Sequence, residues 1–209
     1  MKVPLESVYF KYSVEGHEEA QQEIIDSMFN QASESHKAEV DDITTFKDGK
    51  KAEKTEDRIS ETDFFLEHNN IPEYFNVADR KTKMMEQMLE EFRGIGYDDI
   101  TVENVWFQQY HTSDTHSWHT HGLSHWAVVY YVELPEGSPP THLKSAVTGE
   151  TLVPDVGEGD VLIIPAQTIH RSPPNKASGR KTIIDINIVC SGDCHSKNAR
   201  YQEPQVSLP

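Results

Sequence analysis

The sequence predicts a mainly β domain, a jelly roll (cupin-like double-stranded β-helix) with N-terminal helices packed on one of its sheets. Two observations predict this class. The second half of the chain consists of short segments rich in β-branched and aromatic residues, separated by turn residues. The first half has helical periodicity and polar, charge-dense stretches instead. Many short antiparallel strands following one another are typical of a jelly roll.

Two segments of the first half predict helices. Residues 18–33 and 79–93 carry apolar side chains at three- and four-residue spacing, and Gly94 is placed to end the second helix. The methionine-rich stripe of that helix indicates core packing. The polar stretch 33–62 predicts a loop with a short strand over 43–46. We expect the isolated histidines His17, His36 and His68 to be solvated.

The second half predicts strands bounded by proline and glycine turns. The predicted strands cover residues 101–110, 124–134, 151–153, 161–164 and 181–190. We therefore expect one domain with three parts: a helical and loop extension over residues 1–100, a jelly-roll core over 101–190 and a loosely ordered tail over 191–209.

The composition of the 209-residue chain narrows the choice of partners. A net charge of −16 disfavours general binding to nucleic acid or to an anionic membrane. No apolar run is long enough to span a membrane, and the N-terminal residues do not resemble a signal peptide. Two cysteines do not form a disulfide framework, and they fit a reducing compartment. We expect a cytoplasmic protein that uses neither nucleic acid nor membrane, and its oligomeric state stays open.

The histidines predict a metal site. His119 and His121 stand two residues apart, so in a strand they share one face and can bind one metal ion. His170 follows a turn, a buried strand and Pro165, which brings a third imidazole beside them in a jelly roll. Nearby alternatives for a ligand or a neighbouring role are His116, His125 and Asp114.

Arg180 and Thr182 open the last predicted strand and share one of its faces. A guanidinium and a hydroxyl so placed suit the distal carboxylate of a dicarboxylic acid. The alternative is an arginine paired with one of the chain's many acidic residues.

Together, these motifs resemble the iron(II)- and 2-oxoglutarate-dependent oxygenase superfamily. Its members carry His-x-Asp/Glu, a distal histidine and then Arg-x-Ser/Thr. More narrowly, residues 106–110, 118–121 and 129–135 are similar to a family of bacterial and phage oxygenases with His-x-His in place of His-x-Asp. The resemblance covers about residues 58–190.

The resemblance implies a catalytic Fe(II) held by His119, His121 and His170. It also implies 2-oxoglutarate as co-substrate, held by Arg180 and Thr182. The side chains of Tyr110 and Gln108 share a strand face and are further candidates for cofactor contact. The implied activity is a dioxygenase that uses O2 to hydroxylate a small molecule or a peptide. Loops over 112–117 and 138–144 are candidates for substrate selection.

One departure from the superfamily pattern leaves alternatives open. With His121 in place of a carboxylate, three neutral imidazoles leave a divalent metal site at a charge of about +2, which favours an anionic co-substrate. A three-histidine cupin dioxygenase that does not use 2-oxoglutarate is one alternative. A non-catalytic metal-binding jelly roll is another. The cluster of Cys190, Cys194 and His195 lacks a fourth ligand for a structural zinc site.

Overall fold

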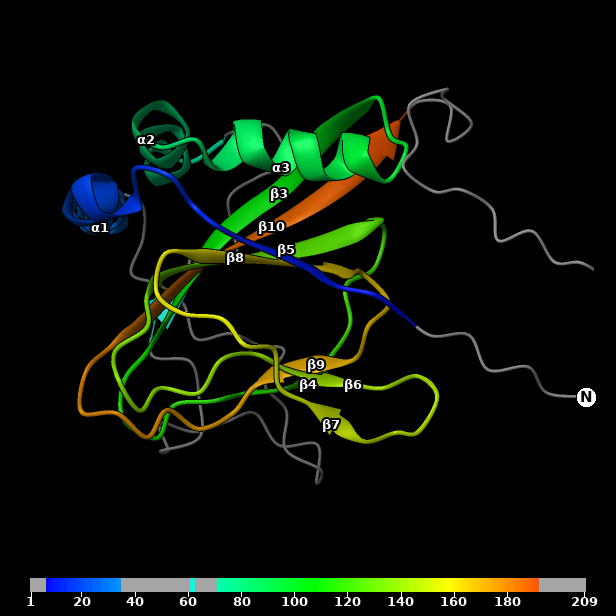
Figure 1. The fold of residues 1–209 in the computed structure, drawn as a ribbon. Coiled ribbons are helices and arrows are strands. Elements are labelled where there is room, and N and C mark those ends of the chain that lie inside the picture. Colours follow the sequence, from blue (N-terminus) through cyan, green and yellow to red (C-terminus); the bar gives the residue numbers. More distant parts are fainter. Residues whose placement is uncertain (1–6, 35–60, 63–70, 192–209) are drawn as a thin grey trace, which may run out of the picture.

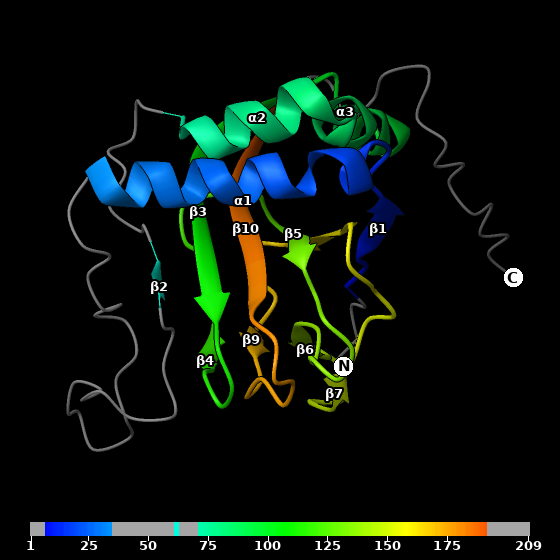
Figure 2. The same ribbon diagram turned by 90° about the vertical axis from the view of Figure 1, so that its left-hand side faces the viewer.

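The computed structural model describes residues 7–34, 61–62 and 71–191. Two antiparallel sheets face each other, and three helices cover the outer face of the larger one (Figures 1 and 2). The major sheet has the strand order β1-β8-β5-β10-β3-β2, and the minor sheet has the order β4-β9-β6-β7. This arrangement confirms the predicted jelly roll with helices packed on one sheet.

The described residues form three helices and ten strands. The helices are α1 (His17–Glu34), α2 (Glu73–Lys81) and α3 (Met84–Gly94). The strands are β1 (Phe10–Ser13), β2 (Glu61–Thr62), β3 (Asp99–Tyr110), β4 (His116–His119), β5 (Trp126–Glu133), β6 (His142–Lys144), β7 (Thr151–Leu152), β8 (Asp160–Pro165), β9 (His170–Ser172) and β10 (Lys181–Ser191).

The central strands of the major sheet are buried on both faces. In β10, Ile184, Ile186 and Ile188 belong to the core beneath the helices, together with Val128 and Tyr130 of β5. The alternate residues of the two strands face the minor sheet, where a smaller core forms around Tyr110, Tyr131, Leu143, Leu162 and Ile183. Side chains of alternate residues point to opposite faces of a strand, so the odd-numbered residues of β10 line the interior between the sheets.

The predicted helix over 79–93 is in fact two helices, α2 and α3, that meet at Thr82. Thr82 has an extended backbone, with φ −126° and ψ 176°. Its hydroxyl donates to the carbonyl of Ala78 (2.7 Å) and accepts from the N–H of Met84 (3.1 Å). These bonds end one helix and begin the next. The prediction was wrong here because the apolar spacing runs on across a break of two residues.

The five predicted strands are present, with ends that differ by up to two residues. The sequence analysis missed β1, β2 and β6, which have two to four residues each and are too short to show an alternating pattern. It expected strands at residues 119–121 and from His170 without giving their bounds, and the structure begins β9 at His170 but ends β4 at His119. The predicted strand over 43–46, most of the predicted loop over 33–62 and the tail beyond residue 191 lie outside the described residues.

The segment before α1 is integrated into the core. β1 pairs with β8, so part of the predicted extension is an edge strand of the major sheet. His17 is not solvated as expected: it is 7% exposed, and its Nδ1 lies 2.7 Å from the Tyr130 hydroxyl. His36 and His68 lie outside the described residues. Among the helices described, none is long and apolar enough to cross a membrane.

Candidate metal centre

The three histidines that the sequence singled out come together at one end of the minor sheet. β4 and β9 are neighbours, and His119 is the register partner of His170. His121 follows β4 and is held by a hydrogen bond from its N–H to the carbonyl of Ala166 (2.9 Å). One ring nitrogen of each histidine lies within 4.8 Å of the corresponding nitrogens of the other two. This spacing allows the three rings to bind one metal ion.

The hydrogen bonds of the rings determine which nitrogen is free. Nδ1 of His119 lies 2.7 Å from the carbonyl of Ser117, and Nδ1 of His170 lies 2.8 Å from the carbonyl of Thr168. Nδ1 of His121 lies 2.6 Å from Oδ1 of Asn187 on β10. Since a carbonyl oxygen only accepts, each Nδ1 carries the proton and each Nε2 keeps its lone pair. Such partners orient metal-binding histidines and fix their tautomer.

Burial keeps these rings neutral. Removal from water lowers the pKa of His121 to about 4 and that of His170 to about 3, and it also lowers the pKa of His119. A neutral imidazole is the form that binds a metal ion. The three histidines can therefore bind a metal ion near neutral pH without first losing protons from Nε2.

The alternative ligands do not join this cluster. His116 is buried and stacks on His119, with ring centroids 4.1 Å apart, so it supports the site from one side. The exposed His125 accepts a hydrogen bond at Nδ1 from the N–H of Cys190 (3.0 Å). The carboxylate of Asp114 accepts from the N–H of His111 (2.9 Å) and stabilises the turn before β4.

The predicted pair Arg180 and Thr182 lies on Glu133, the last residue of β5. The guanidinium makes a two-pronged contact with the carboxylate, with Nε to Oε2 at 2.8 Å and Nη2 to Oε1 at 2.9 Å. The hydroxyl of Thr182 donates to the same carboxylate. Thr182 belongs to the face of β10 that carries the isoleucines beneath the helices, so this pair and the histidines lie on opposite faces of the major sheet.

Between these two residues, Lys181 faces the interior. It is 1% exposed, and its Nζ donates to the carbonyl of Pro139 and to the hydroxyl of Ser172, both at 3.0 Å. The ammonium also lies 5.3 Å from the ring centroid of Tyr110 and 5.7 Å from that of Tyr131. Burial lowers the pKa of Lys181 to about 7. The sequence reading missed this buried cation.

The interior face of the major sheet carries further polar groups beside Lys181. Tyr110 and Gln108, both singled out from the sequence, are hydrogen-bonded to each other and buried. Asp185 is 5% exposed, and burial raises its pKa to about 8. The Gln108 amide makes hydrogen bonds to both neighbours when its nitrogen donates to Oδ2 of Asp185 (3.3 Å) and its oxygen accepts from Nε1 of Trp106 (3.2 Å). The sequence does contain a pattern that indicates this polar interior. Polar residues 181, 185 and 187 share one face of the strand, and residues 184, 186 and 188 on the other face are isoleucine.

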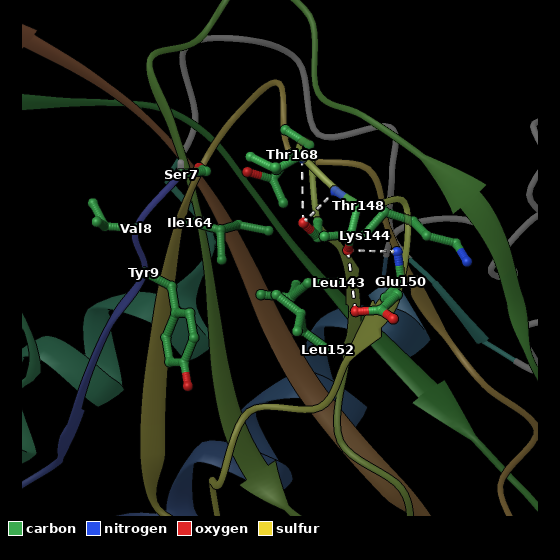
Figure 3. Close-up of a pocket in the computed structure, with 13 residues that line it drawn as sticks. Ser7, Val8, Tyr9, Leu143, Lys144, Thr148, Glu150, Leu152, Ile164 and Thr168 are labelled. Carbon is green, nitrogen blue, oxygen red and sulfur yellow. Dashed lines mark hydrogen bonds between the residues drawn. The ribbon is translucent and has the colours of Figure 1, made fainter. Parts of the chain in front are cut away.

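A cavity of about 320 Å³ lies at the other edge of the two sheets (Figure 3). Leu143 of β6 and Ile164 of β8 point into it, and Val8 and Tyr9 form its outer wall. None of the three clustered histidines lines this cavity, so it is separate from the candidate metal centre. Thr168 lines the cavity, and its backbone carbonyl is also the hydrogen-bond partner of Nδ1 of His170.

The fold and the site define a jelly-roll protein with a candidate three-histidine metal centre. No protein-family model and no curated protein matches the chain. Several solved structures have the same fold. A viral collagen prolyl hydroxylase of Paramecium bursaria Chlorella virus-1, in complex with 2-oxoglutarate, is 15% identical with a TM-score of 0.52, over 88% of this chain and 96% of that one.

Two other solved structures also have the same fold. HygX of Streptomyces hygroscopicus, with nickel and 2-oxoglutarate bound, is 8% identical with a TM-score of 0.57, over 88% of this chain and 83% of that one. A Trichoplax adhaerens prolyl hydroxylase in complex with a hypoxia-inducible-factor peptide is 12% identical with a TM-score of 0.56, over 86% and 82%. The chain therefore has the fold of the 2-oxoglutarate- and iron(II)-dependent oxygenases.

Proposed function

We propose that this protein is an Fe(II)- and 2-oxoglutarate-dependent dioxygenase that hydroxylates a small molecule or a peptide. The observation that carries the proposal is the set of three converging, neutral imidazoles, each with its Nδ1 proton held by a carbonyl and its Nε2 free. His119, His121 and His170 would hold the metal. When bound, iron and 2-oxoglutarate would supply the oxidising chemistry with O2.

The donor set fits this cofactor pair. Imidazole suits Fe(II), and three protein ligands leave coordination positions open for a chelating co-substrate and for O2. Three neutral ligands keep the full charge of the metal, which favours a dianionic chelator. Asn187, Ser117 and Thr168 would hold the rings in the orientation that coordination needs.

Within this proposal, Lys181 would hold the far carboxylate of 2-oxoglutarate. Its ammonium is the one cationic group of β10 that faces the interior, among the strand residues that the structure describes. Its neighbours there, Tyr110 and Ser172, carry hydroxyl groups that suit the same carboxylate. The apolar residues of the inner core would exclude water from this region.

The sequence-based prediction that Arg180 and Thr182 hold the co-substrate remains an alternative. It requires the co-substrate to reach the face of β10 opposite to the histidines, where Glu133 already binds Nε and Nη2 of Arg180. Lys181 lies on the interior face, and we therefore favour it.

Anaerobic titration with Fe(II) and then 2-oxoglutarate tests the proposal through the visible charge-transfer band of the chelate. The parent protein should bind iron and develop the band on addition of 2-oxoglutarate. His121→Ala should lose iron, whereas His111→Gln, at an exposed histidine outside the cluster, should keep both signals. Absence of iron binding in the parent would contradict the proposal.

A three-histidine dioxygenase that does not use 2-oxoglutarate is the second candidate. The absence of a carboxylate from the candidate ligand set favours it, as does the engagement of Arg180 by Glu133. Iron binding without any 2-oxoglutarate band at millimolar co-substrate would support this candidate against the first.

A further inference from the structure

The outer face of the minor sheet carries a cluster of aromatic and cationic side chains. Arg171 of β9 and Lys144 of β6 both reach over the ring of Trp118 on β4, with the guanidinium carbon 4.6 Å and Nζ 4.7 Å from the ring centroid. His142 of β6 is the register partner of Arg171 and so lies on the same face. We refer to Trp118, His142, Lys144 and Arg171 as the cationic face.

The same strands hold the candidate metal centre on their other side. His119, His170 and Leu143 alternate with the residues of the cationic face and point into the interior. The cationic face is therefore on the far side of the minor sheet from the metal centre, and its binding properties do not depend on the proposed function.

Within the described part of the chain, neither Arg171 nor Lys144 makes an ion pair, whereas half of the basic residues there do. Five basic residues elsewhere make ion pairs, and these are Lys11, Arg80, Lys81, Lys83 and Arg180. Across residues 7–34, 61–62 and 71–191, no carboxylate lies within ion-pair distance of Arg171 or Lys144. The chain as a whole is acidic, with 35 acidic and 19 basic residues. Arg171 and Lys144, both over the ring of Trp118, therefore form a local region of positive charge on it.

Two nitrogen atoms of the cationic face also have no hydrogen-bond partner. Nε of Arg171 and Nδ1 of His142 are both buried and unpaired. A ligand that supplies a hydrogen-bond acceptor to the guanidinium of Arg171 therefore meets a group that is not fully satisfied within the protein. Burial and the neighbouring Arg171 both lower the pKa of His142, in keeping with a positive local field.

We propose that the cationic face is a docking site for an acidic peptide, with a Glu or Asp carboxylate bound by Arg171 and Lys144 against the ring of Trp118. The carboxylate of a Glu or Asp side chain accepts two parallel hydrogen bonds from a guanidinium. The methylene groups of the same side chain can pack on an indole ring. A net charge of −16 repels long polyanions such as nucleic acids, so a short acidic peptide fits better.

The position of β4 favours an extended peptide over a free small acid. β4 is the end strand of the minor sheet, and no strand in the described part of the chain pairs with its outer edge. A peptide that runs beside β4 can add backbone hydrogen bonds, and every second side chain would then lie on the outer face near Trp118.

Fluorescence anisotropy of a dye-labelled hexaglutamate peptide tests the proposal, with labelled hexaglutamine as the uncharged match. At low salt, hexaglutamate should bind and hexaglutamine should not. Arg171→Gln should weaken binding by about tenfold or more, because a charge-assisted hydrogen bond is lost from a half-buried position. Trp118→Leu should also weaken binding.

Arg80→Gln is the matched control, since it removes the same charge from an exposed position on α2 and should leave the affinity unchanged. Far-UV circular dichroism verifies that each variant still folds. Three results would overturn the proposal: no hexaglutamate binding in the parent, equal loss in Arg80→Gln and Arg171→Gln, or tighter binding of a single-stranded DNA hexamer than of hexaglutamate. Failure of the dioxygenase proposal would leave this outcome unaffected.

Discussion

Lys181→Met separates the two candidate anchors for the co-substrate. Methionine keeps the length of the side chain beside Tyr110 and Tyr131 but removes the ammonium and its two hydrogen bonds at 3.0 Å. A hydrogen bond to a charged group contributes about 1.5–3 kcal/mol. Loss of that contact should raise the Kd for 2-oxoglutarate by roughly tenfold to 150-fold, measured anaerobically from the charge-transfer band of the iron chelate.

Arg180→Gln is the comparison. Because Arg180 contacts Glu133 on the other face of the strand, this change should leave the Kd for 2-oxoglutarate within about twofold. It should instead lower the free energy of unfolding by about 1–2 kcal/mol, since both side chains are roughly a quarter exposed and solvent weakens the pair. Denaturant unfolding measures this loss. If Arg180→Gln abolishes 2-oxoglutarate binding while Lys181→Met retains it, the assignment of faces in β10 is refuted.

The pH dependence of the same titration provides a second check on Lys181. Burial lowers its pKa to about 7, and an anionic ligand binds the protonated form. The affinity should therefore be highest below pH 7 and should fall by up to about tenfold per pH unit above it. Asp185→Asn should move this fall in affinity to lower pH, because the Asp185 carboxylate raises the pKa of Lys181 and its removal leaves less of the protonated form. A Kd that stays constant from pH 6 to 8.5 would contradict this role of Lys181.

Two further predictions concern the support of the site and of the fold. Asn187→Ala removes the partner of Nδ1 of His121 and should weaken Fe(II) or Ni(II) affinity by about 10- to 100-fold, measured by competition with a chelator. An unchanged metal affinity would contradict the orienting role. Gly159→Ala places a Cβ 2.8 Å from the ring of His17 at φ +81° and should lower stability by about 2–3 kcal/mol in denaturant unfolding. Gly137→Ala, at φ +86° with no neighbour within 4 Å, should lose only about 1 kcal/mol from backbone strain. Equal losses would exclude the steric contact.

Much of the architecture could be predicted because the periodicity of apolar residues in a long segment indicates whether it forms a helix or a strand. The strands over 101–110 and 181–190 were found within two residues of their observed ends. The short strands β1, β2 and β6 were missed, since two to four residues do not establish a period and their pairing depends on distant partners. The break at Thr82 was missed because a side-chain cap interrupts the helix without interrupting the apolar spacing.

The sequence by itself indicated which histidines to group: the spacing of His119 and His121 and the position of His170 after a buried strand predicted the set that the structure brings together. A shared strand face is not what joins His119 and His121, because β4 ends at His119 and His121 is placed by its hydrogen bond to Ala166. Which face of β10 meets the histidines was decided only by the tertiary structure. Alternation places Arg180 and Thr182 on one face and Lys181 and Asp185 on the other, but it does not say which face is interior. The helices cover the face that carries Thr182, and Glu133 engages both Arg180 and Thr182, which leaves Lys181 and Asp185 inside.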